Sequence, residues 1–193
     1  LLGAEQSGFI TDMGFETYQK ILSEAMEELG VETGLTSGNI KGSYVSDCTI
    51  ETDQLALIPD SYISLSAEKI RIYKELDSLG SDSEIETVKS RLEDRFGPIP
   101  EELAALLMIV RIRHRGEKLG FEKIIIKNGI MILFFINNPM SQYYKSPVFQ
   151  SVIESLNKNH DFELKQNDNR LRLVNRKVES LDKAYALLGK LGK

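Results

Sequence analysis

The hydrophobic pattern changes its period at Gly120, and this change limits the folds that the chain can adopt. Before Gly120, apolar residues recur every three or four positions, which is typical of amphipathic helices. After it, pairs of short extended segments flank Asn128-Gly129 and residues 167–169, and such turns favour β-hairpins. An α+β fold is therefore expected, with helices packed against two β-hairpins in a small antiparallel sheet.

Turn and cap residues predict the order of these elements. Three helices are expected first, with Ser66 capping the first and Ser81, paired with Glu84, capping the second. Gly97-Pro98 ends the second helix. The elements expected after an extended stretch at 47–63 are helices at 66–79, 82–96 and 100–119, a hairpin at 122–136, a helix at 147–158, a hairpin at 162–174 and a helix at 180–191.

The glycine content of residues 30–43 divides the chain into three parts. Four glycines in this window predict a flexible linker between residues 1–29 and a body at residues 44–193. Within the first part, residues 14–29 carry an apolar stripe opposite an acidic face, as a separate amphipathic helix would. An isolated helix of this length is marginal in water, so its stripe is expected to fold back on the body or to meet another copy.

Composition and single residues exclude several functions. The chain has 24 basic and 29 acidic residues and a net charge of −5, which weighs against binding nucleic acid through phosphates. Its one cysteine, Cys48, forms no internal disulfide and lies in an apolar stretch, so it is expected to be a buried structural thiol. His114 is expected on the surface of a helix end, and His160 in a solvated turn. No apolar run is long enough to cross a bilayer.

Two clusters of charge could serve as interaction sites. In the helix expected at 82–96, Thr87, Arg91, Asp94 and Arg95 share one flank, where Arg91 and Asp94 can pair. This flank is either a solvated helix surface or a charged docking face. The basic run at 111–115 could contact nucleic acid, but its side chains point in all directions and do not form one strip. Because positive charge is favoured in the last turns of a helix, the run is expected to balance the helix dipole.

Several segments are specific enough to indicate a family. The segments LLGAEQSGFITDMGFETYQKIL, LIPDSYI, RIYKELDSL and RLEDRFGPIPEEL resemble the RecG-like branch of superfamily 2 DNA translocases, and more narrowly the transcription-repair coupling factors. The resemblance covers essentially the whole chain. It implies that residues 1–29 end the translocation motif region and that residues 44–193 are the C-terminal domain of that family.

The resemblance also implies what the chain does. The full protein of this family is a bacterial, cytoplasmic, ATP-driven DNA translocase that removes stalled RNA polymerase and recruits nucleotide excision repair. Its ATP and magnesium bind outside this chain, for which no cofactor, metal or catalytic residue is expected. Gln6 matches the glutamine of the translocation motif and is expected to be inert here.

Within that family, the C-terminal domain docks on an N-terminal UvrB-like module and masks its UvrA-binding surface. Asp94 and Arg95 match the charged residues that carry this contact, whereas Arg91 replaces a residue that is acidic in some members. The resemblance therefore implies an autoinhibitory domain whose indirect partners are UvrA and RNA polymerase. Neither nucleic acid nor a membrane is an expected direct partner.

Other functions stay open at this point. The chain could be an autonomous DNA-binding or protein-interaction domain, and salt-dependent binding of duplex DNA would support the first of these. It could be a small enzyme, although no triad or ligand set is present to support one. It could also self-associate through residues 14–29.

Overall fold

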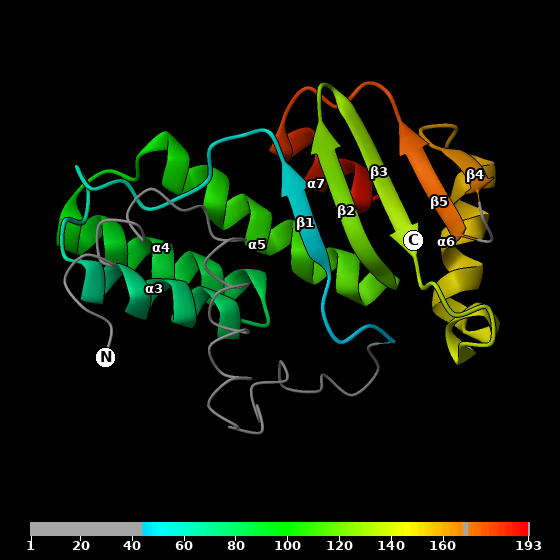
Figure 1. Cartoon of the computed structure of the whole chain (residues 1–193), viewed down its shortest axis with the longest axis horizontal. Helices are drawn as coiled ribbons and strands as arrows, with labels where there is room; N and C mark the ends of the chain where they lie inside the picture. The colour runs from blue at the N-terminus through cyan, green and yellow to red at the C-terminus, as the bar shows by residue number, and fades with distance from the viewer. Residues whose placement is uncertain (1–43, 168–169, 193) are drawn as a thin grey trace. The chain divides into compact units, whose positions relative to one another are not determined.

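The computed structural model describes residues 44–167 and 170–192. The expected helix at 14–29, the linker at 30–43 and Gln6 lie outside the described residues, and the domain boundaries drawn from them stay predictions. The described residues form two compact units. One unit contains residues 55–110, and the other contains residues 44–54 and 111–192 (Figure 1).

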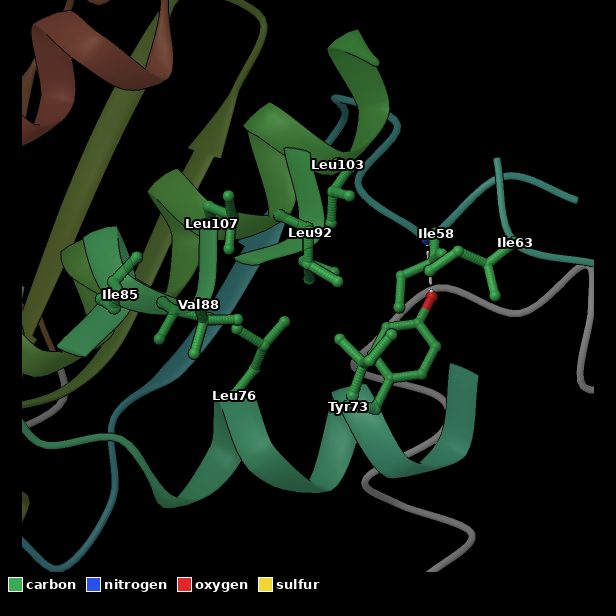
Figure 2. Packing of buried hydrophobic residues seen from close by; sticks show 12 residues of the cluster. Ile58, Ile63, Tyr73, Leu76, Ile85, Val88, Leu92, Leu103 and Leu107 are labelled. Carbon is green, nitrogen blue, oxygen red and sulfur yellow. Dashed lines mark hydrogen bonds between the residues drawn. The ribbon is translucent and has the colours of Figure 1, made fainter. Parts of the chain in front are cut away.

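The first unit is helical. It contains α3 (Ser66–Ser78), α4 (Asp82–Phe96) and the first part of α5 (Glu101–Leu119). Figure 2 shows that apolar side chains from these helices and from the preceding loop meet in one core. The stripe expected on α4 is confirmed, since Ile85, Val88 and Leu92 are buried and Phe96 is partly buried. The all-round apolar start of α5 is explained by its place in this core.

Of the two helix caps predicted in this unit, one is confirmed and the other is wrong. The Ser81 side chain caps α4 by accepting a hydrogen bond from the Glu84 N–H, as expected. The Glu84 carboxylate accepts from the Gly80 N–H, one residue before the position that a capping box predicts. The expectation that Ser66 caps α3 is wrong, because the helix begins at Ser66 itself and Leu65 holds the cap position.

The second unit is built on a five-stranded sheet in the order β1-β2-β3-β5-β4. Both hairpins are confirmed, and Asn128 and Gly129 have the positive φ angles of 53° and 72° that a tight turn requires. The sheet is mixed rather than antiparallel, since β1 pairs with β2 in parallel. The strands are β1 (Thr49–Thr52), β2 (Phe121–Lys127), β3 (Ile130–Phe135), β4 (Glu163–Asn167) and β5 (Arg170–Asn175).

Helices pack on this sheet. Figure 1 shows α7 and the last turns of α5 on the same side of the sheet. The approach of α5 is close: a Cβ added at Gly116 would lie 2.8 Å from both the Cys48 Sγ and the Ile124 Cδ1. Cys48 is fully buried there, as expected. The other helices of this unit are η1 (Gln142–Lys145), α6 (Pro147–Lys158) and α7 (Leu181–Leu188).

Candidate interaction surface on helix α4

The predicted docking flank lies on the outer surface of α4. Thr87, Arg91, Asp94 and Arg95 are all exposed, while the opposite stripe of the helix is buried in the core of the first unit. The flank therefore exists as a continuous exposed surface. Its use in docking stays a prediction.

Two of the four residues are tied to the neighbouring helix α3. Arg91 Nη2 lies 2.5 Å from Glu75 Oε2, and Arg95 Nη1 lies 2.6 Å from Glu68 Oε1. Glu68 also accepts a hydrogen bond from Arg71, at 2.6 Å. The side chains of Arg91 and Arg95 therefore join two helices and have a limited range of positions.

These ion pairs change the charge that the flank presents. The Glu68 carboxylate has its pKa lowered by hydrogen bonds and charge from Arg71 and Arg95, and the bond to Glu75 raises the pKa of Arg91. The expected pairing of Arg91 with Asp94 is not found. Within the part of the chain that the structure describes, Asp94 has no ion pair or hydrogen-bonded side-chain partner, so it presents an uncompensated carboxylate.

The carboxyl end of α4 is held by aromatic and backbone contacts. The Arg95 guanidinium lies 4.8 Å from the centre of the Phe96 ring, and that ring lies 5.7 Å from the ring of Tyr62. The Tyr62 hydroxyl is 3.0 Å from the Leu92 carbonyl oxygen and 2.9 Å from that of Gly97. The loop before α3 is thereby fastened to the end of α4.

One buried charge in this unit was missed by the sequence reasoning. The side chain of Lys69 is 2% exposed and forms an ion pair with Asp60 in the loop before α3. A signal was present, because Lys69 precedes Ile72 and Tyr73 by three and four residues and so lies on the buried stripe of α3. The pair fixes the loop to the helix rather than forming a site.

The basic run at 111–115 does not form an exposed strip. Arg113 is 6% exposed, and Arg115 is half-buried, with its guanidinium 3.8 Å from the centre of the Tyr185 ring and hydrogen bonds to Tyr185. The expectation that His114 lies on the surface is wrong: it is 5% exposed, because α5 stays covered through its last turns. His160 is exposed, as expected.

Among the described residues, neither a metal-binding cluster nor a membrane-spanning helix is present. No group of three or more histidine, cysteine, aspartate or glutamate side chains is placed to bind a metal ion. None of the helices described here has the length and apolar character needed to cross a bilayer.

Comparisons with known proteins agree with this architecture. The fold defines the class as a small α+β domain, and a solved structure titled "Crystal structure of C-terminal domain of transcription-repair coupling factor" shares it, with a TM-score of 0.61 and 23% identity over 74% of this chain and 88% of that chain. Residues 52–146 match the family model described as the TRCF domain.

Curated relatives point to the same family. The transcription-repair-coupling factor of Rickettsia bellii is 36% identical over 142 residues, which is 73% of this chain and 12% of that protein. That of Escherichia coli is 34% identical over 126 residues, 64% of this chain and 10% of that protein. The chain thus spans about an eighth or less of the length of these relatives.

Proposed function

We propose that this chain is a regulatory segment of a bacterial transcription-repair coupling factor. It docks through the α4 flank on the N-terminal UvrB-like module of the same polypeptide and covers the surface that binds UvrA. The whole protein is a cytoplasmic, ATP-dependent DNA translocase that removes stalled RNA polymerase and recruits excision repair. ATP and magnesium act in its motor, and this segment takes no cofactor and performs no catalysis.

One observation carries the docking proposal. The flank combines Asp94, whose carboxylate has no ion-pair or hydrogen-bond partner among the described residues, with two arginines whose positions are set by Glu75 and Glu68. Charges that are already held in place lose little side-chain entropy on binding. An uncompensated acidic group next to them selects a basic partner and disfavours an acidic one.

The energetics suit a contact that must open. A docked domain masks a site only while the docked state is lower in free energy than the exposed one, and a competing partner can reverse that balance. Interfaces between domains of one chain are typically modest and polar. Because the two partners share one polypeptide, a weak contact is enough for masking, since the effective concentration is high.

The test is a charge reversal in a polypeptide that contains both this domain and the UvrB-like module. Asp94→Arg should raise UvrA binding about tenfold if docking loses about 1.4 kcal/mol. Glu154→Arg is the control, because Glu154 is an exposed glutamate on α6 and its reversal changes the net charge equally. UvrA affinity is measured by titration at fixed ionic strength.

If Asp94→Arg and Glu154→Arg give the same UvrA affinity as the unchanged protein, α4 does not hold the masking contact. If both raise it equally, the effect comes from net charge rather than from this flank.

A further inference from the structure

Leu65 departs from the residue preference at the start of a helix. It occupies the N-cap position of α3, where its side chain makes no capping hydrogen bond. Leu65 is also 71% exposed, so its side chain does not stabilise the fold through buried apolar contacts. Serine, threonine, aspartate and asparagine are the residues preferred at this position, because their side chains bind the free N–H groups of the first turn.

A single exposed leucine needs no explanation by itself. Leu55, for example, is 64% exposed and lies in a loop. Leu65 differs because a polar residue there would stabilise the helix, whereas leucine gains nothing within the described structure. Positions that break a local rule without a compensating gain are expected at functional sites.

The position of Leu65 joins it to the α4 flank. Tyr62, three residues before it, contacts the carbonyl oxygens at the carboxyl end of α4. Glu68, three residues after it, binds Arg95 on that same helix end, and the Glu68 N–H donates to the Leu65 carbonyl at 3.0 Å. Leu65 is therefore bracketed by two contacts to the carboxyl end of α4.

We propose that Leu65 is the apolar anchor of the docking surface and enters an apolar recess on the partner, next to the basic group that meets Asp94. This inference rests on the proposed function, since the partner is the module that the α4 flank contacts. A charged contact alone mainly selects the partner and speeds encounter, whereas a desolvated apolar anchor supplies affinity and slows release.

The experiment compares three variants in the polypeptide that contains both modules. Leu65→Ser should raise UvrA binding about tenfold, because the anchor is lost. It should also raise the melting temperature of the 193-residue chain, because serine can cap α3. Leu65→Met keeps an apolar side chain and should leave UvrA binding unchanged, and Leu55→Ser, at a similarly exposed leucine, should change neither property.

The outcomes separate this inference from the proposed function. If Asp94→Arg raises UvrA binding and Leu65→Ser does not, the flank docks without the anchor and this inference is overturned. If Leu65→Ser lowers the melting temperature, Leu65 serves the fold and the inference is again overturned. If neither Asp94→Arg nor Leu65→Ser changes UvrA binding, the proposed function itself fails.

Discussion

Gly120 is the residue at which steric limits are tightest. It follows the last residue of α5 with φ of 84°, a conformation that side-chain-bearing residues rarely adopt. A Cβ added there would lie 2.1 Å from the ring of Tyr143, and the Tyr143 hydroxyl donates to the Leu119 carbonyl at 2.7 Å. Burial raises the pKa of that hydroxyl, so it stays protonated and keeps donating. The end of α5 is thus fixed by the close packing of the Gly120 backbone against the buried ring of Tyr143.

Gly120→Ala is therefore expected to lower the free energy of unfolding by about 3 kcal/mol, from backbone strain and overpacking together. Gly129→Ala is the matched control, because Gly129 has φ of 72° and open space around its Cβ position. It should cost about 1 kcal/mol from strain alone. Urea unfolding measures both, and equal losses would mean that the Tyr143 ring moves aside freely.

Single residues also show where sequence reasoning succeeds and where it stops. The apolar neighbours of Cys48 correctly indicate that its side chain is buried. The basic residues around His114 indicate an exposed helix end, but His114 is buried because the second unit, to which it belongs, covers that part of α5. The sequence does not indicate Leu65 as the N-cap of α3, because the neighbouring Ser66 has the side chain preferred at that position. Which residue starts a helix depends on contacts that a local pattern does not contain.

Helices α3 and α4 act as a pair, and their ion pairs lie on the surface. Arg91 and Glu75 are partly exposed, so this pair contributes about 0.2–1 kcal/mol at most. The pairs therefore matter for where the charges point more than for stability. The Glu68 carboxylate accepts hydrogen bonds from both Arg71 and Arg95, so its pKa can be used to measure these contacts.

The pKa of Glu68 should report on the pair. It lies below its ordinary value near 4.5 because the two arginines favour the charged form, with the hydrogen bond from Arg71 the larger cause. Arg71→Gln should raise it more than Arg95→Gln does. Lys74→Gln removes the same charge from an exposed position on α3 and should leave it unchanged. Carboxyl resonances followed by NMR give the three pKa values.

The sign of the stability effect follows from the same shift. A carboxyl with a lowered folded pKa stabilises the fold above its unfolded pKa, and the contribution is lost as the pH falls through the folded pKa. Above about pH 6, the free energy of unfolding of the Arg71→Gln and Arg95→Gln variants should change with pH as it does in the unchanged protein. The pH dependence should differ only below about pH 4.5. A difference confined to neutral pH would contradict this assignment.

Elements with local signals could be predicted, and elements without them could not. The hairpin between β2 and β3 follows from Asn128-Gly129, and the start of α4 follows from Ser81 with Glu84. Strand β1 was expected only as extended chain, because it has four residues and its partner is far along the sequence. The flank on α4 could be derived from helix angles, but its pairing with α3 could not, since a sequence does not show how helices meet.

At the scale of the molecule, two cores stabilise two units. The apolar cluster between Ile58 and Val110 belongs to the first unit alone. Leu76 is fully buried in it, and Leu187 on α7 is buried in the other unit. Substitutions at these positions remove side chains of equal size from different cores.

Leu76→Ala and Leu187→Ala should each lower the free energy of unfolding of the unit concerned by about 2–5 kcal/mol. Hydrogen exchange should show faster exchange in α3 and α4 for the first variant, and in α7 and the sheet for the second. Amides in the other unit should keep their rates. If either variant speeds exchange equally throughout the described residues, the two units unfold as one.

The parallel pairing of β1 with β2 has a consequence for synthesis. Thr49 pairs with Lys123, so helices α3, α4 and α5 are translated between the two partners. On a ribosome, the helical residues can form their own core early, whereas the edge strand waits unpaired until its neighbour emerges. Newly made chains should therefore pass through a stage in which this strand is open to proteases and to pairing with other chains.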